Sequence, residues 1–134
     1  MTAQLIDGKK IASDLLQTIK KEIEARENKQ IRKPCLAVIL IGDNPASEVY
    51  VRNKKIACEK VGIKSISVDL KSDVTEKEVL ELVNKLNDDS EVDGILVQSP
   101  LPKHVNEDLV INAISPLKDV DGFHPTNIGL LAIK

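Results

Sequence analysis

The chain has 134 residues, of which 42% are hydrophobic, and its 19 basic and 21 acidic residues give a net charge of −2; this length fits one domain. The balanced charge and the presence of only two aromatic residues, Tyr50 and Phe123, exclude the basic surface and the base-stacking platforms that nucleic-acid binding needs. The longest wholly apolar run, residues 35–41, is far shorter than the ~20 residues that span a bilayer, which excludes a membrane-spanning helix.

The first half of the chain predicts a helix, a strand and a second helix. Over residues 9–27, isoleucine or leucine recurs every four residues among charged positions, which predicts a helix that packs along one side. Residues 35–41 are continuously apolar, as in a strand that is covered on both faces. A turn, GDNPAS, then leads into a second helix, with an asparagine cap, a proline in its first turn and a glycine at its end. The residues behind these predictions are Ile11, Leu15, Ile19 and Ile23 in the first helix, and Asn44, Pro45 and Gly62 around the second.

The second half alternates between strands and helices. Residues 66–70 alternate apolar and polar side chains, which favours a strand with one wetter face near the sheet edge. Thr75 and Glu78 form a capping box for a third helix. Residues 95–97 predict a third strand, ending at Gln98, and a shorter helix follows around residues 107–114. This order predicts an α/β fold, a doubly wound three-layer domain with a mainly parallel sheet.

Ligands of open parallel sheets bind beyond the carboxyl ends of the strands, and the second helix carries polar residues there. Ser47, Tyr50 and Lys54 share an arc of roughly 80° on this helix. The same arc carries two apolar residues, Ala57 and Val61. This arc predicts a hydroxyl, a phenol and an ammonium group on the face toward the sheet, where polar groups need partners or a ligand. In the alternative interpretation, Lys54 extends to water and Tyr50 is a surface aromatic.

Gln98 favours the first interpretation, because it ends an apolar strand at the same edge of the sheet. A buried amide there needs a hydrogen bond, and Lys54 is the nearest partner that we predict. A lysine held by a neutral amide in a partly dry cleft can exchange protons near neutral pH. The prolines of the following S-P-L-P segment stiffen the backbone, as the wall of a pocket requires.

A second segment flanked by prolines, residues 116–125, is rich in Asp and Gly. Asp121, beside the conformationally free Gly122, can accept hydrogen bonds from an amino-pyrimidine edge. The alternative is an ordinary surface turn.

Cofactor and metal motifs are missing from the sequence. No two glycines lie within two residues of one another, so the G-x-G-x-x-G dinucleotide fingerprint is absent and we expect no cofactor-binding residues in this chain. The spacing and the sequence context of Cys35 and Cys58 predict inert buried thiols rather than a redox pair or a zinc site. The DVDG segment lacks the later ligands of a calcium loop, and we expect no metal site.

Three segments, YVRNKKIACEKVGI, DGILVQSPLPKH and KDVDGFHPTNIG, closely resemble signature segments of the bifunctional methylenetetrahydrofolate dehydrogenase/methenyltetrahydrofolate cyclohydrolase family. The resemblance runs from about Leu5 to the last residue. It implies an enzyme with tetrahydrofolate substrates that oxidises 5,10-methylenetetrahydrofolate with NADP and hydrolyses the 5,10-methenyl product to 10-formyltetrahydrofolate, without a metal. It also implies a C-terminal Rossmann domain that binds NADP, and a full-length homodimer.

The resemblance assigns roles to particular residues. Lys54 is the principal catalytic residue, Gln98 holds and tunes it, and Ser47 supports the cluster. Tyr50 stacks on or lines the pterin, and Asp121 binds the polar edge of the pterin. The family usually has leucine in its VQLPLP segment where this chain has Ser99, so the fine substrate contacts there differ. The implied catalytic set is Lys54, Tyr50, Gln98 and Asp121, and the implied substrate-binding set adds Ser47, Val97, Ser99 and Pro100.

The chain has no nicotinamide-binding domain, and it ends on an apolar helical stripe. We therefore expect residues 1–134 to be the N-terminal folate-binding catalytic domain of a longer protein that binds NADP elsewhere. No segment resembles a signal peptide, and we expect a cytoplasmic location. Two alternatives stay open: the substrate domain of another two-domain dehydrogenase, such as a shikimate or amino-acid dehydrogenase, and a non-catalytic ligand-binding module of the same fold. The proposed set of site residues suits a flat, uncharged pterin better than a small carboxylate that needs arginine.

Overall fold

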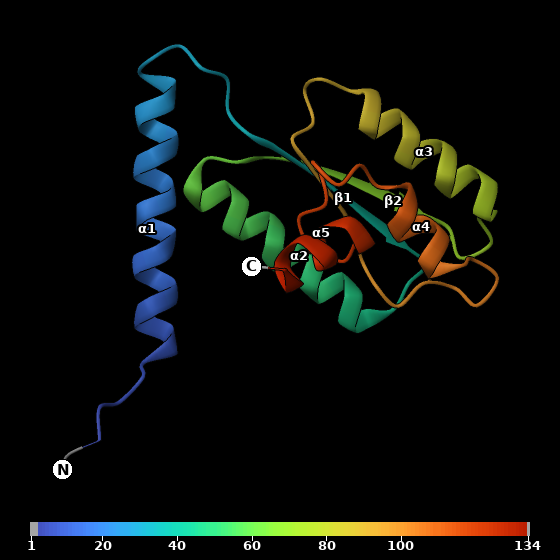
Figure 1. Ribbon diagram of the computed structural model, residues 1–134, viewed down its shortest axis with the longest axis horizontal. Coiled ribbons are helices and arrows are strands. Elements are labelled where there is room, and N and C mark those ends of the chain that lie inside the picture. Colours follow the sequence, from blue (N-terminus) through green and yellow to red (C-terminus); the bar gives the residue numbers. More distant parts are fainter. Residues whose placement is uncertain (1–2, 134) are drawn as a thin grey trace.

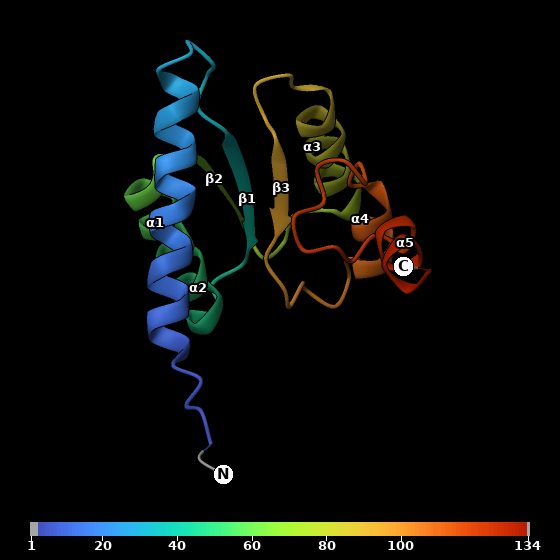
Figure 2. The same ribbon diagram turned by 60° about the vertical axis from the view of Figure 1, so that its left-hand side comes forward.

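The computed structural model describes residues 3–133, which form a three-stranded parallel sheet with helices on both faces (Figures 1 and 2). The strand order is β2-β1-β3, and Figure 2 shows α1 and α2 on one side of the sheet and α3, α4 and α5 on the other. The predicted three-layer, doubly wound α/β fold is confirmed. The elements in chain order are α1 (Gly8–Glu27), β1 (Cys35–Ile41), α2 (Pro45–Val61), β2 (Lys64–Leu70), α3 (Glu76–Asp88), β3 (Gly94–Val97), α4 (Glu107–Ala113) and α5 (Pro125–Ala132).

The central strand β1 divides the core into two parts, because successive side chains of a strand point to opposite faces. Ala37, Ile39 and Ile41 pack with the buried side chains of α3 and α4. Val38 and Leu40 pack with buried side chains of α2 and β3 on the other face. The strand is therefore covered on both faces, as its continuous apolar sequence predicts.

Most of the predicted element ends are confirmed. The Asn44 side chain accepts hydrogen bonds from the first turn of α2, and Gly62 ends that helix with φ at 89°. Thr75 and Glu78 form the predicted capping box of α3. β3 ends at Val97, one residue earlier than predicted, although the Gln98 N–H still donates to the main-chain oxygen of β1 residue 39 at 2.9 Å.

The apolar side of α1, on which the helix was predicted to pack, is buried at one end only. Only Ile23, near the C-terminal end of α1, is buried, whereas Ile11 and Leu15 are 57% and 59% exposed. Figure 1 shows α1 at the side of the domain next to α2, and the sheet does not extend beneath its first turns. Over residues 3–133, no helix is both long and apolar enough to cross a membrane.

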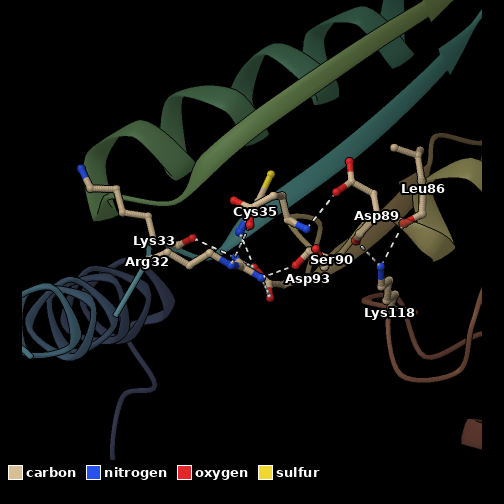
Figure 3. A network of polar contacts seen from close by, with 9 residues as sticks. Arg32, Lys33, Cys35, Leu86, Asp89, Ser90, Asp93 and Lys118 are labelled. Atoms are coloured by element: carbon tan, nitrogen blue, oxygen red, sulfur yellow. Dashed lines mark hydrogen bonds and ion pairs between the residues drawn. The ribbon is translucent and has the colours of Figure 1, made fainter. Parts of the chain in front are cut away.

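A polar network joins the amino ends of β1 and β3 (Figure 3). The Arg32 guanidinium donates to both carboxylate oxygens of Asp93, at 2.6 and 2.9 Å, and also to the Ser90 carbonyl at 2.7 Å. The Asp93 carboxylate accepts a further hydrogen bond from the Cys35 N–H at 2.8 Å. This network lies at the edge of the sheet opposite to the carboxyl ends of the strands, so we assign it a structural role.

Asp93 makes stability depend on acid pH. The Arg32 hydrogen bond, helped by the Cys35 N–H and opposed by burial, lowers the pKa of Asp93. In the unfolded chain, this carboxyl titrates at about pH 3.9. Around that pH, the unfolded state binds more protons than the folded state, because the folded pKa is lower. Asp93 therefore stabilises the fold above that pH, and this stabilisation is lost as the pH falls through the folded pKa. We expect Asp93→Asn to flatten the fall in stability below about pH 4. Urea unfolding at several pH values measures this, with the exposed Asp88→Asn as control; parallel pH curves for wild type and Asp93→Asn contradict it.

Lys118 completes the C-terminal end of α3. Its ammonium donates to the carbonyl oxygens of Leu86, Asn87 and Asp89 at 2.9, 2.7 and 2.7 Å. These carbonyls belong to the helix end, where main-chain acceptors lack helical partners. We expect Lys118→Met to lower the free energy of unfolding by about 1–3 kcal/mol, measured by urea unfolding. Lys85→Met, at an exposed position of α3, is the control, and equal unfolding midpoints for the two variants contradict the role.

Candidate active site

The carboxyl edge of the sheet brings Lys54 and Gln98 together. Lys54 projects from α2, which follows β1 directly, and Gln98 follows β3, which pairs with β1 in parallel. The Lys54 Nζ donates to Gln98 Oε1 at 2.8 Å in a partly buried contact. The hydrogen bond predicted from the sequence is therefore confirmed, and Lys54 does not simply extend to water.

The main-chain carbonyl of Ser99 orients this pair. The Gln98 Nε2 donates to the Ser99 carbonyl at 2.9 Å, and the Ser47 hydroxyl, on a residue that is 2% exposed, donates to the same oxygen at 3.4 Å. A carbonyl only accepts, so it holds the NH₂ side of the amide and leaves the amide oxygen for Lys54. The resemblance implies that Ser47 supports the cluster, and its hydrogen bond to the Ser99 carbonyl is a contact through which it can do so.

Tyr50 lies at the rim of this cluster and not on the packed face. Its side chain is 60% exposed. The buried face of α2 is formed by Ser47, Val51, Cys58 and Val61. At about 100° per residue, Val51 and Cys58 lie about 40° and 20° to one side of Ser47, and Tyr50 lies about 60° to the other side. The prediction that Tyr50 lies on the face toward the sheet is therefore wrong. Tyr50 is a surface aromatic, as in the alternative interpretation, and its ring is free to contact a ligand.

A small pocket of about 20 Å³ lies on the other side of β3. It is formed by β3, α4 and the loop of residues 119–123, and most of its lining is apolar. Asp121 contributes a carboxylate and Ser99 a hydroxyl. Phe123, which is 57% exposed, lines the pocket and does not anchor its loop in the core. The lining residues are Ile95, Val97, Ser99, Leu101, Glu107, Val110, Ile111, Ile114, Asp119, Asp121 and Phe123.

The proposed site residues thus form two groups around the end of β3. Lys54, Gln98 and Ser47 form a hydrogen-bonded cluster on the α2 side. Val97, Ser99 and Asp121 line the pocket on the α4 side. Ser99 belongs to both groups, through its carbonyl and its side chain. Pro100 follows it in an exposed segment after a cis peptide bond, and Tyr50 lies at the exposed rim.

Sequence reasoning missed Glu107 and Asp119 as parts of the site. The Ser99 hydroxyl donates to the Glu107 carboxylate in the first turn of α4, so Ser99 has a polar partner where the family usually has leucine. Asp119 organises the loop that carries Asp121. The available signal was the Asp-x-x-Gly spacing of Asp119 and Gly122, which is typical of a side chain that caps a turn.

The two cysteines are buried and free. Burial raises the pKa of the Cys35 and Cys58 thiols, which disfavours the reactive thiolate and supports their interpretation as inert. Across residues 3–133, no group of three or more His, Cys, Asp or Glu side chains is arranged to hold a metal ion.

The turn between β1 and α2 does not fit the pyrophosphate of a dinucleotide. In such sites, free N–H groups at the helix N-terminus bind the phosphates. Here the Asn44 side chain already accepts from the N–H groups of Ala46 and Ser47, at 3.0 and 3.2 Å, and Gly42 is the one glycine of the turn. The residues present therefore do not form an NADP site of that kind.

A hydrogen-bonded lysine at the carboxyl edge of a parallel sheet, beside a mostly apolar pocket with a carboxylate, is typical of the ligand-binding edge of an α/β domain. The family model described as tetrahydrofolate dehydrogenase/cyclohydrolase, catalytic domain, matches residues 6–121. The chain belongs to this family, which confirms the resemblance carried by the three sequence segments.

Individual relatives agree. The chain is 54% identical over all 134 residues to a protein from Neisseria gonorrhoeae named bifunctional protein FolD and covers 47% of its length. The crystal structure of a bifunctional FolD methylenetetrahydrofolate dehydrogenase/cyclohydrolase from Campylobacter jejuni superposes with a TM-score of 0.94 at 48% identity, over 97% of this chain and 46% of that one. The Trypanosoma brucei FolD, solved with NADP cofactor and an inhibitor, gives 0.91 at 32% identity, over 99% and 46%. The chain thus spans about half the length of these relatives.

Proposed function

We propose that this chain is the folate-binding catalytic half of an enzyme that oxidises 5,10-methylenetetrahydrofolate with NADP and hydrolyses the resulting 5,10-methenyltetrahydrofolate to 10-formyltetrahydrofolate. The observation that carries the proposal is the 2.8 Å contact of Lys54 with Gln98 beside a pocket that contains Asp121. Membership of the family supports the choice of reaction over that of a shikimate or amino-acid dehydrogenase.

Lys54 assists hydrolysis by moving protons. Water adds to the cationic methenyl carbon, and the Lys54 amine takes a proton from that water. The ring then opens at the bond between this carbon and one ring nitrogen. That nitrogen takes the proton held by Lys54, and the new hydroxyl group loses its proton to solvent as it becomes the formyl oxygen. Gln98 keeps the Lys54 nitrogen at a fixed place during both proton transfers, which is the geometric requirement of general acid–base catalysis.

Substrate binding uses the residues around the pocket. Asp121 is exposed and receives no side-chain hydrogen bond from any of residues 3–133, so its oxygens are available to the amino edge of a pterin. Val97 and Ser99 line the pocket, and Pro100 borders it as the next residue after Ser99. Tyr50, exposed at the rim of the Lys54 cluster, supplies an aromatic face for stacking.

NADP binds outside residues 1–134. In support of this, the N–H groups at the start of α2 already donate to Asn44 and are not free to bind a phosphate. The half of the relatives that this chain does not match has room for such a domain, and the NADP-complexed relative shows that a family member takes this cofactor. The complete enzyme works as a cytoplasmic homodimer.

A chimera tests this function. Residues 1–134 replace the matching half of the Neisseria gonorrhoeae relative, to which they are 54% identical. We expect the chimera to reduce NADP with 5,10-methylenetetrahydrofolate and to hydrolyse 5,10-methenyltetrahydrofolate, and we expect residues 1–134 alone not to reduce NADP. A folded chimera that hydrolyses the methenyl substrate no faster than buffer contradicts the proposed function. Reduction of NADP by residues 1–134 alone contradicts the division of roles.

A further inference from the structure

We propose that Asp119 is a positioning residue, which fixes the loop of residues 119–124 so that Asp121 faces the pocket. The inference rests on the proposed function, because that function gives Asp121 its role toward the substrate. Asp119 touches no reacting atom in this proposal and acts through Asp121.

The carboxylate of Asp119 lies at the centre of the loop. One oxygen accepts from the Gly122 N–H at 3.0 Å. The other accepts from the His124 N–H at 2.9 Å and from the Asn127 Nδ2 at 2.9 Å. A loop of six residues is thus wrapped around one side chain, and through Asn127 the same side chain ties the loop to α5.

The start of the loop is joined to the sheet. The Ile95 N–H of β3 donates to the Lys118 carbonyl at 2.7 Å, and Ile95 and Asp119 form a parallel β-bridge. The sheet therefore fixes the position of the Asp119 main chain, and the Asp119 side chain fixes the conformation of the loop. The position of β3, which Gln98 follows directly, therefore determines where the loop places Asp121.

The other loop residues fit this role. Gly122 has φ at 70°, and an added Cβ there would meet nothing within 4 Å. The glycine is therefore needed for the backbone conformation and not for space, and that conformation includes the N–H donated to Asp119. Asp121 and Phe123 lie on either side of Gly122 and both line the pocket. The hydrogen bonds of the loop leave the Asp121 carboxylate unused.

The chemistry calls for a carboxylate at position 119. An ionised carboxylate only accepts and has about four lone-pair sites, whereas an amide has one accepting oxygen and an NH₂ group. In Asp119→Asn, that NH₂ group faces main-chain N–H donors, which leaves at least one donor without a partner. The variant changes no volume, so the core of the domain stays intact.

The first measurement is amide hydrogen exchange in the 134-residue chain. We expect Asp119→Asn to speed exchange at Gly122 and His124 by about tenfold, the effect of one lost hydrogen bond to a charged group, with exchange in β1 unchanged. Asp88→Asn, an exposed carboxylate at the end of α3, is the matched control and leaves the loop amides unchanged. Unaltered exchange at Gly122 and His124 in Asp119→Asn overturns the proposal.

The second measurement is hydrolysis of 5,10-methenyltetrahydrofolate by the chimera. We expect Asp119→Asn to raise KM by about tenfold with a smaller change in kcat, because substrate binding is affected more than the reaction. A purely structural role for Asp119 lowers the melting temperature and leaves KM of the folded enzyme unchanged, and this result overturns the proposal.

A double variant separates this proposal from the proposed function. If Asp119 acts through Asp121, then Asp119→Asn adds nothing to the KM of Asp121→Asn, since effects within one coupled unit are not additive. Additive effects overturn the positioning role. An unchanged KM in Asp121→Asn alone contradicts the substrate role of Asp121, and hydrogen exchange still tests whether Asp119 holds the loop.

Discussion

Lys54→Met in the chimera lowers the rate of 5,10-methenyltetrahydrofolate hydrolysis by about 10²- to 10⁴-fold, the usual contribution of a positioned general acid or base. Methionine replaces the apolar stem of lysine with a chain of the same length and lacks the terminal nitrogen, so the packing of α2 changes little. The variant loses the amine that takes the proton of the attacking water. The measurement is kcat with saturating substrate, after subtraction of the uncatalysed rate.

Two further variants show whether proton transfer or charge is the cause. Lys55→Met removes the neighbouring exposed lysine and is expected to keep the wild-type rate. Lys54→Arg keeps the positive charge but cannot release a proton near neutral pH, so we expect it to be as slow as Lys54→Met. A wild-type rate in Lys54→Met removes the catalytic role of Lys54 and favours a non-catalytic ligand-binding module.

The contact of Lys54 with Gln98 was predictable because it depends on topology and local sequence alone. The caps around α2 place that helix directly after β1, and parallel pairing puts the carboxyl ends of β1 and β3 at one edge. Whatever the details of packing, a polar residue in the first turns of α2 and another at the end of β3 then lie close together. The same locality explains why the capping box and the strand bounds could be predicted to within a residue or two.

Predictions that depend on what covers a surface were less successful. The periodicity of α1 correctly indicates an apolar stripe but does not say whether another element lies on it, and Ile11 and Leu15 are exposed. On α2, the apolar residues chosen to define the inner face omitted Val51 and Cys58, which are buried. Their inclusion rotates the inner face away from Tyr50. A helical pattern thus gives the face of a helix only as accurately as its apolar residues are chosen.

Side chains that organise loops were hardest to predict, because their partners are main-chain groups. Asp119 bonds to N–H groups of its own loop, and Lys118 to carbonyls at the end of α3. Every residue except proline offers such groups, so no residue type in the sequence marks the partner. Glu107 was missed for a different reason. Its carboxylate bonds to the Ser99 side chain eight residues earlier, and no sequence pattern gives the path of the loop between them.

We expect Gln98→Glu to have the second-largest effect on catalysis and to lower the hydrolysis rate by about 10²-fold or more at neutral pH. Two effects combine. The carboxylate cannot donate to the Ser99 carbonyl, so that an oxygen faces an oxygen where Nε2 was 2.9 Å away. The remaining oxygen places a negative charge beside the Lys54 ammonium, which favours its protonated form.

A second variant distinguishes the added charge from the lost orientation. Gln98→Met removes the orienting amide without adding charge, so we expect its rate of hydrolysis to fall less than that of Gln98→Glu. Lys54→Met, which has no amine, gives the lower limit for both variants. If Gln98→Glu and Gln98→Met hydrolyse the substrate at the same rate, the charge beside Lys54 has no effect, and Gln98 acts only by orienting the lysine.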